Sequence, residues 1–225
     1  MGIPVWTARR PVPGEKATQV SSPETQSNPM QSEIIDSTVV GNDPWAELQN
    51  EVANCTACDL HATRTQTVFG VGNHQADLMI VGEAPGRDED LQGEPFVGKA
   101  GQLLNQMLLA IGFQRQDIFI ANILKCRPPN NRDPLPEEVE ACSSFLARQI
   151  NLVKPKVILS VGGVSAKNLL HSADRIGKLR GIVHTHQETG TPLVATYHPA
   201  YLLRSPTEKR KVWSDLLLAK KLVSQ

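Results

Sequence analysis

From residue 77 to the C-terminus, short apolar runs alternate with longer segments of helical periodicity. The apolar runs end at Gly or at turn-forming residues and are too short for helices, so they are typical of buried strands. They span residues 77–82, 117–124, 156–162 and 192–199. The helical segments span residues 101–112, 136–153, 164–170 and 206–223. Strands that alternate with helices form a parallel sheet with helices on both faces, so we predict an α/β fold.

Residues 1–43 differ from the rest, because they are rich in Pro, Ser, Thr and Gln and poor in side chains that could build a core. We therefore predict a disordered tail over residues 1–43 and a single domain over residues 44–225. A solvated leader is favoured over a partner-binding segment. The domain is expected to begin with a helix, since Asp43 is a good N-cap, Pro44 suits the first turn, and apolar residues follow at helical spacing.

The charge balance limits the function. Lys plus Arg and Asp plus Glu total 23 each, so the formal net charge is zero. This excludes a protein that coats nucleic acid or anionic lipid by bulk charge, and it leaves room for a local basic face. No run approaches the roughly 18 apolar residues of a membrane span, and the N-terminus lacks the apolar core of a secretory signal. We expect a cytoplasmic protein that acts as a monomer and makes no membrane contact.

Ligands of such sheets bind beyond the carboxyl ends of the strands, and here these ends carry unusual residues. The first strand runs into Gly82-Glu83-Ala84-Pro85-Gly86, with Phe96 further on. The glycines suit a loop shaped around a flat ligand, or simply a tight turn into a helix. The second strand ends at Asn122, whose amide matches the edge of a base; capping of its own strand end is the alternative.

The third and fourth strand ends carry a Gly pair and a His. Gly162 and Gly163 suit a helix start, or backbone amides that hold a phosphate. His198 precedes a Pro in a rigid loop, which suits a functional His as well as a structural one. Leu203 and Arg204 follow, as ordinary packing or as an apolar wedge with a phosphate anchor.

The four cysteines form one C-x2-C pair and two distant residues: Cys55, Cys58, Cys126 and Cys142. In a cytosolic chain they are expected to be reduced, so metal binding is a better interpretation than disulfides. Four thiolates can hold either zinc or a 4Fe-4S cluster. A zinc ribbon would normally show two closely spaced C-x2-C pairs, and this chain has one.

The chain carries four motifs in order: C-x2-C-x-L-x3-R from Cys55, GEAPGRDED-x2-GEPFVGKAG from Gly82, NILKCRPPNNR from Asn122 and HPAYLLR from His198. Together they resemble the family 4 uracil-DNA glycosylases, the iron–sulfur type, from about Trp45 to the C-terminus. The resemblance implies a three-layer α/β/α domain around a four-stranded parallel sheet. It implies hydrolysis of the N-glycosidic bond of deoxyuridine in DNA, after the base is flipped from the stack. It also implies a 4Fe-4S cluster held by Cys55, Cys58, Cys126 and Cys142.

The same resemblance assigns roles to the pocket residues. His198 is expected to donate a hydrogen bond to uracil O2 as negative charge develops there. Asn122 is expected to read uracil N3 and O4, and so to reject cytosine, whose pattern of donors and acceptors is reversed. Phe96 is expected to stack on the base. The backbone at Gly82, Glu83 and Ala84 is expected to line the pocket and hold the water.

Two positions depart from the better-known family 1 enzymes. Ala84 stands where those enzymes carry an Asp that assists the attacking water, so Glu83 is our first candidate for that role; positioning of the water by the backbone is the alternative. Gly86 stands where family 1 has a Tyr that excludes the thymine methyl group. Glu89 is expected to fill that space.

DNA contacts are expected from Lys125 and Arg127, from the amides of Gly162 and Gly163, and from the Leu203–Arg204 pair. The cluster is expected to be structural and to tie the N-terminal helix to the segment 126–142. Two other functions stay open at this point. One is a non-catalytic module that captures uracil-containing DNA, and the other is an electron-transfer or zinc-binding protein.

Overall fold

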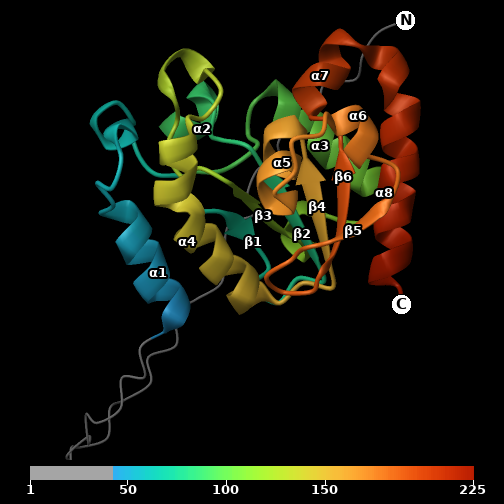
Figure 1. Ribbon diagram of the computed structural model, residues 1–225, viewed down its shortest axis with the longest axis horizontal. Helices are drawn as coiled ribbons and strands as arrows, with labels where there is room; N and C mark the ends of the chain where they lie inside the picture. The colour runs from blue at the N-terminus through green and yellow to red at the C-terminus, as the bar shows by residue number, and fades with distance from the viewer. Residues whose placement is uncertain (1–42) are drawn as a thin grey trace, which may run out of the picture. The chain divides into compact units, whose positions relative to one another are not determined.

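Six strands form one mixed sheet in the order β1-β3-β2-β4-β6-β5 (Figure 1). The computed structural model describes residues 43–225. The strands are β1 (Val71–Gly72), β2 (Leu78–Gly82), β3 (Phe119–Asn122), β4 (Val157–Val161), β5 (Val183–Thr185) and β6 (Pro192–Thr196). The helices are α1 (Pro44–Ala53), α2 (Arg87–Gln92), α3 (Lys99–Ala110), α4 (Pro136–Val153), α5 (Gly163–Leu170), α6 (Ile176–Leu179), α7 (Pro199–Arg204) and α8 (Lys209–Val223). Short 3-10 turns lie at Asp59–Ala62, Arg115–Asp117, Pro129–Asn131 and Pro206–Glu208.

The sheet corrects one prediction. The four expected strands are β3, β2, β4 and β6, and they run parallel to one another. The sheet is nevertheless six-stranded, because β1 and β5 add antiparallel edges. Neither edge strand gives an apolar run: β1 has only two residues, and β5 is mostly exposed. Short, half-exposed edge strands carry little sequence signal, which is why the expectation of a four-stranded sheet was wrong.

Alternating side chains of the strands build a core on each face of the sheet. In β2, Met79 and Val81 face the layer that contains α4, α5 and α6, together with Trp45 of α1. Leu78 and Ile80 face the layer that contains α3, α7 and α8. Successive strand residues point to opposite faces, so uninterrupted apolar strands require cover on both sides. The described chain therefore forms the three layers α/β/α.

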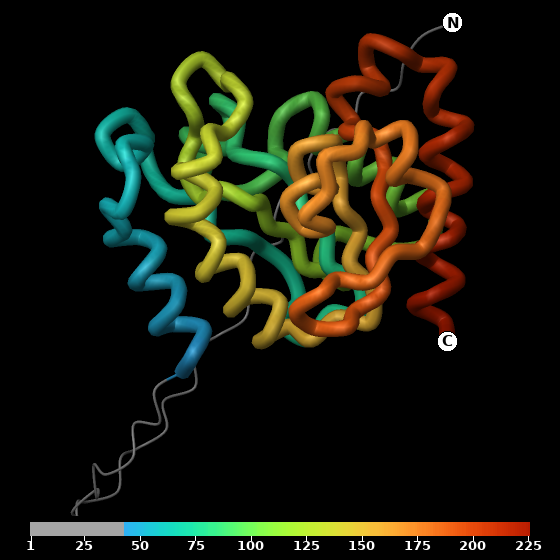
Figure 2. Tube along the Cα trace, in the orientation of Figure 1, coloured from blue at the N-terminus to red at the C-terminus, as the bar shows by residue number. Residues whose placement is uncertain are grey.

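The first helix begins as its sequence predicts. Asp43 is the N-cap and accepts a hydrogen bond from the backbone N–H of Trp45 at 3.0 Å, and Pro44 is the first helical residue. Helix α1 lies beside α4, far away in the sequence, as the trace in Figure 2 shows. An ion pair between Glu51 and Arg148 joins the two helices. The predicted disordered tail over residues 1–43 lies outside the described residues, apart from Asp43.

Parallel strands bring their carboxyl ends to one edge of the sheet, where the motifs that begin at Gly82, Asn122 and His198 meet. Gly82 pairs with Asn122 in the β2–β3 ladder, and Val161 pairs with Thr196 in the β4–β6 ladder. Beyond the ladder, the backbone N–H of Leu124 donates to the Glu83 carbonyl at 3.0 Å. The segment after β6 was expected to be a rigid loop, but His198 caps α7, because Pro199 suits a first helical position.

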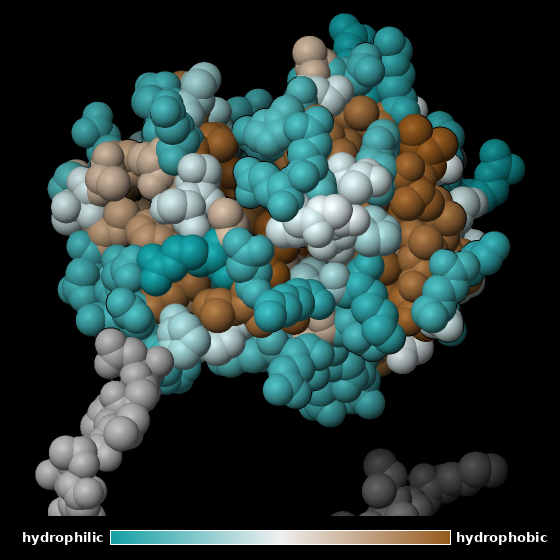
Figure 3. Space-filling model, turned by 60° about the horizontal axis from the view of Figure 1, so that its bottom comes forward, coloured by the Kyte–Doolittle hydropathy of each residue, from teal (hydrophilic) through white to brown (hydrophobic). Residues whose placement is uncertain are grey.

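Few large apolar side chains are exposed, and several of these belong to α3 and α8: Leu109, Trp213 and Leu217. Figure 3 shows apolar surface gathered on the side of the domain where α8 lies. In residues 43–225, no helix combines the length and the hydropathy that crossing a bilayer requires.

Candidate functional site

An open pocket of about 590 Å³ lies at the carboxyl edge of the sheet. This volume falls in the usual range of small-molecule sites, roughly 300–1,000 Å³. The lining includes most residues that the sequence singled out: Glu83, Ala84, Gly86, Glu89, Phe96, Asn122, His198 and Arg204. Side chains from three strand ends and from the loop before α3 thus converge on one cavity.

Gly82, the last residue of β2, lies against two side chains of the pocket wall. A Cβ atom at this position would lie 2.3 Å from Oδ1 of Asn122 and 2.6 Å from Cζ of Phe96. Both distances are far below van der Waals contact, so only glycine allows these side chains to lie where they do. The bare backbone of Gly82 therefore lets the amide and the ring meet at the pocket wall.

Asn122 presents an unused acceptor. The residue is 2% exposed, and its Oδ1 is buried without a hydrogen-bond partner among residues 43–225. Its backbone carbonyl, by contrast, accepts from Nζ of Lys125 at 2.8 Å. A buried polar atom left without a partner costs about 1–3 kcal/mol, and native structures retain few of them. This acceptor is therefore available to an N–H group of a ligand.

His198 presents a donor. Its Nδ1 accepts a hydrogen bond from the backbone N–H of Ala200 at 3.2 Å, so the neutral ring carries its proton on Nε2. Burial lowers the pKa of His198 to about 4; Glu89 opposes this shift and Arg204 reinforces it. At neutral pH the imidazole is therefore uncharged and can donate from Nε2.

Phe96 is held in an unusual conformation. It has a φ of 55°, which is rare for an aromatic residue, and its ring stacks 5.6 Å from the His198 ring at an angle of 29°. The carbonyls of Pro95 and Phe96 both accept hydrogen bonds from the Arg115 guanidinium. Sequence reasoning missed Arg115, because no motif links it to a loop 19 residues earlier.

The side chain of Glu89 lies close to the backbone of Gly86. A Cβ atom at Gly86 would lie 2.7 Å from its Oε2. Its Oε1 accepts hydrogen bonds from the backbone N–H groups of Val97 and Gly98, at 2.9 Å and 3.0 Å. The carboxylate therefore also anchors the loop that carries Phe96, a role that the sequence did not indicate.

Glu83 lies in the pocket wall with a perturbed carboxyl group. Burial raises its pKa to about 7, and the negative charge of Asp133 adds to the shift. A carboxyl group with this pKa is partly protonated at neutral pH, which suits proton transfer. Ala84, next to it, contributes only a methyl group to the lining.

The structure corrects one predicted DNA contact. Lys125 is 1% exposed, and its ammonium group donates to the Asn122 carbonyl and to Oε1 of Gln149, at 2.8 Å and 2.7 Å. It is therefore an internal support and not a phosphate ligand. A Lys side chain normally reaches solvent, and only the tertiary structure shows that this one is enclosed.

Of the remaining predicted DNA contacts, Arg127, Leu203 and Arg204 are accessible, whereas Gly162 is buried and its N–H donates to the Thr196 carbonyl at 2.9 Å. Arg127 is partly exposed and donates from Nε to Oδ1 of Asn131 at 2.7 Å. Leu203 is 48% exposed, and Arg204 lines the pocket. Gly162 has a φ of +102°, and a Cβ atom there would lie 3.4 Å from His198. The Gly162–Gly163 turn therefore adjoins the pocket.

The four cysteines line one small cavity near the end of α1 and the first half of α4, although the sequence separates them widely: Cys55, Cys58, Cys126 and Cys142. Among residues 43–225, no three His, Cys, Asp or Glu side chains are arranged as ligands of a metal ion. The four cysteines are therefore grouped here only because they line the same cavity. Nη1 of Arg64 donates to Cys126 Sγ at 3.1 Å, and the backbone N–H of Lys125 donates to Cys142 Sγ at 3.4 Å. Four cysteines are a donor set that iron–sulfur clusters use, and hydrogen bonds to sulfur are common around such clusters.

Comparison with known proteins decides the family. A sequence model of the uracil DNA glycosylase superfamily matches residues 69–217. The type-4 uracil-DNA glycosylase of Archaeoglobus fulgidus is 47% identical over 175 residues, which are 75% of this chain and 88% of the relative. The chain belongs to the uracil-DNA glycosylase superfamily. A second type-4 relative, from Thermotoga maritima, is 41% identical over 181 residues, which are 79% of this chain and 94% of the relative.

Membership in the uracil-DNA glycosylase superfamily, and the type-4 name of these relatives, confirm the resemblance drawn from the motifs. The matched region, residues 69–217, contains every pocket residue described above as well as Cys126 and Cys142. Cys55 and Cys58 precede it. A more distant relative, the type-5 uracil-DNA glycosylase of Pyrobaculum aerophilum, is 30% identical over 193 residues.

Proposed function

We propose that the chain is a monofunctional uracil-DNA glycosylase, which flips deoxyuridine out of DNA and hydrolyses its N-glycosidic bond. The products are free uracil and an abasic site. One observation carries this proposal: a buried, unpaired acceptor on Asn122 and a neutral donor on His198 face the same pocket. Uracil presents the complementary pattern, with carbonyl acceptors on both sides of an N3–H donor.

Recognition follows from this pattern. The Asn122 Oδ1 accepts from uracil N3–H, and its amide N–H donates to O4. Cytosine has an unprotonated N3 and an exocyclic amine, so it would set acceptor against acceptor and donor against donor. A site that hydrogen-bonds its substrate discriminates by about 10⁴–10⁵-fold against an analogue that leaves the polar groups of the site unpaired.

Catalysis uses His198 as the donor to the leaving base. As the bond between the sugar and uracil N1 breaks, negative charge develops on the base and reaches O2. A neutral imidazole that donates from Nε2 stabilises this charge, and its lowered pKa keeps it in the neutral form throughout the physiological range. Phe96 supplies the face on which the flipped base stacks.

The DNA strand is held beside the pocket. The exposed Leu203 is placed to enter the space that the flipped base leaves, with Arg204 on a neighbouring phosphate. The backbone N–H of Gly163 and the side chain of Arg127 provide further phosphate contacts. The Gly162 N–H is not among them, because it donates to the Thr196 carbonyl at 2.9 Å. Lys125 is not one of these phosphate contacts, because its side chain is buried. Binding through a few phosphates is expected to weaken as salt is raised.

Glu83 is our candidate for the group that takes a proton from the attacking water. Its pKa is raised to about 7, and only the deprotonated carboxylate is a base. We therefore expect kcat for uracil release to rise with pH through about pH 7 and to level off above it. The Glu83→Gln variant should lose activity and this pH dependence together. If that variant keeps wild-type activity, the backbone alone positions the water.

The pocket with four thiols is proposed to hold a 4Fe-4S cluster through Cys55, Cys58, Cys126 and Cys142. Thiolates are the ligand form of cysteine, and a bound cluster offsets the burial that raises the pKa of Cys142 to about 11. When bound, the cluster supplies a rigid cross-link between the end of α1, the segment after β3 and α4. The residues that would carry it bind no base, so its role in this proposal is structural.

Metal analysis tests the cluster. Protein purified without oxygen is expected to contain iron and acid-labile sulfide in equal amounts, and Cys142→Ser should lose both and unfold at a lower temperature. Zinc without sulfide would overturn the assignment.

A uracil-release assay tests the proposed function. Wild-type protein with its metal centre intact is expected to release uracil from single- and double-stranded oligonucleotides that contain deoxyuridine, and to leave alkali-labile sites. Matched oligonucleotides with thymidine or deoxycytidine should stay intact. Protein that retains uracil DNA without releasing the base would instead be a non-catalytic binding module.

A further inference from the structure

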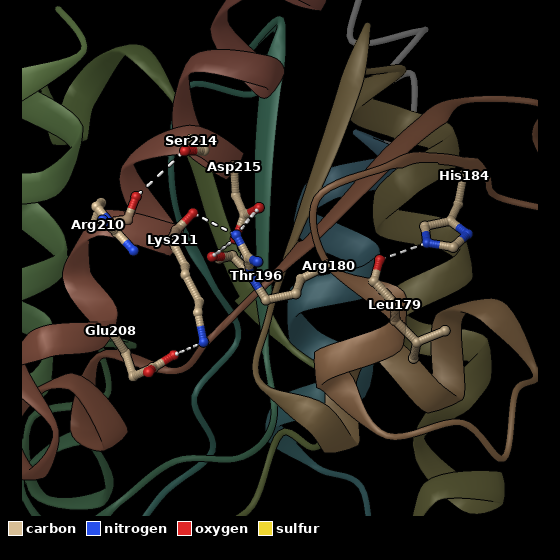
Figure 4. A network of polar contacts seen from close by, with 9 residues as sticks. All are labelled: Leu179, Arg180, His184, Thr196, Glu208, Arg210, Lys211, Ser214 and Asp215. Atoms are coloured by element: carbon tan, nitrogen blue, oxygen red, sulfur yellow. Dashed lines mark hydrogen bonds and ion pairs between the residues drawn. The ribbon is translucent and has the colours of Figure 1, made fainter.

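A buried polar network joins the end of β6 to α8 (Figure 4). Asp215 of α8 is fully buried and accepts hydrogen bonds from Oγ1 of Thr196 at 2.7 Å and from Nε and Nη2 of Arg180, at 3.0 Å and 2.7 Å. Thr196 is the last residue of β6 and precedes His198 by two positions. One carboxylate thus links the strand that leads into the pocket to two helical segments.

Arg180 fastens the same strand end in other ways. Its Nη2 also donates to the Lys211 carbonyl at 2.5 Å, and its guanidinium carbon lies 5.5 Å from the centre of the Tyr197 ring. Its backbone forms a parallel bridge with Ala195. The preceding carbonyl, that of Leu179, bonds to Nε2 of His184 at 2.7 Å, which anchors the Arg180 segment to β5. Arg180 therefore contacts residues on both sides of Thr196.

His198 depends on this support for its position. In the described part of the chain its ring makes a single hydrogen bond, with Ala200 in its own helix. That bond orients the ring within α7 but does not place α7 relative to the sheet. The link to the sheet runs through Thr196, whose carbonyl accepts from the Gly162 N–H at 2.9 Å, and through Tyr197, whose ring packs 5.1 Å from that of Tyr201.

A contribution to the stability of the fold does not by itself explain this network. A buried ion pair pays a desolvation cost that often cancels its attraction, and apolar residues of similar volume can stabilise a fold as well. Its distinctive property is geometric, because a bidentate guanidinium and a hydroxyl fix the carboxylate in one orientation. A displacement of about 1 Å at a reacting group can cost roughly 10²-fold in rate, so such precision matters two residues from a catalytic donor.

We propose that Thr196, Arg180 and Asp215 are positioning residues that hold the end of β6 so that Nε2 of His198 points at the flipped base. This inference rests on the proposed function. None of the three lines the pocket. They act through the backbone of residues 196–198 and through the Tyr197 ring.

Thr196→Val is the informative substitution, because it removes only the hydroxyl and keeps the shape of a β-branched residue. We expect it to lower kcat for uracil release about tenfold with KM changed by less than about twofold, since binding contacts stay in place. Thr196→Ser, which keeps the hydroxyl, should restore most of the rate. Thr191→Val is the matched control: its hydroxyl bonds to Thr189 before the other end of β6, at 2.8 Å, and its removal should leave kcat unchanged.

A double-mutant cycle separates positioning from general loosening. If Thr196 acts only through His198, Thr196→Val should have no further effect on kcat in a His198→Ala background. The same tenfold loss in both backgrounds would overturn the proposal, and so would a wild-type kcat in Thr196→Val itself.

Nitrogen NMR of the imidazole rings gives a readout that needs no turnover. In Thr196→Val, the His198 ring signals should shift or broaden while those of the other five histidines stay in place. Unchanged His198 signals would overturn the positioning role. If the wild-type protein releases no uracil and Thr196→Val still shifts the His198 signals, the proposed function alone is overturned.

Discussion

His198→Ala is expected to lower kcat for uracil release by about 10²–10³-fold, the usual effect of removing one preorganised donor from a developing oxyanion. The KM for uracil-containing DNA should change little, because the donor bonds most strongly to the charge that exists only in the transition state. The measurement is single-turnover release of uracil from a labelled oligonucleotide, at saturating enzyme.

The pH dependence sharpens this expectation. Burial lowers the pKa of His198 to about 4, so its neutral form persists through the working range. An acid limb near pH 6.5 that persists in the residual activity of Glu83→Gln, with loss of rate as His198 gains a proton, would contradict the assignment. The rise through about pH 7 that Glu83 causes has the same sign, and Glu83→Gln removes it, so the two groups can be told apart. His171→Asn, at the exposed end of α5, is the matched control and should keep wild-type activity.

Sequence reasoning succeeded where topology alone brings residues together. Asn122 and His198 end or follow strands that run parallel, and the carboxyl ends of parallel strands meet at one edge of the sheet. Their meeting therefore follows from the alternation of strands and helices, without any knowledge of side-chain contacts. The meeting of the cysteines does not follow from topology in this way, because only the resemblance to a known family places the C-x2-C segment beside α4.

What the sequence could not show depends on tertiary burial. A Lys between Leu124 and Cys126 gives no sign that its ammonium is enclosed by Asn122 and Gln149. Arg115 and Asp215 lie in ordinary helical segments, and their importance comes from partners 19 or more residues away. Charged residues are usually solvated, so the rare buried one is visible only once its partners are placed.

Gly82→Ala adds a single methyl group, and we expect it to cause the second largest loss of uracil release. In Gly82→Ala the new methyl carbon would lie 2.3 Å from Oδ1 of Asn122 and 2.6 Å from Cζ of Phe96. Both are the ends of side chains, so the fold can survive if they move aside, at a cost of about 1–3 kcal/mol for overpacking. The same movement takes the base-reading amide and the stacking ring out of place, so we expect uracil release to fall by about 10²-fold or more.

Gly190→Ala separates this effect from lost stability. Gly190 has a φ of +71° and has no atom within 4 Å of an added Cβ, so alanine there strains the backbone far from the pocket. We expect it to lower the melting temperature by an amount similar to Gly82→Ala and to leave uracil release unchanged. A Gly82→Ala protein that melts like the control and still releases uracil at the wild-type rate would show that Asn122 and Phe96 do not define the base site, because the substitution cannot spare their positions.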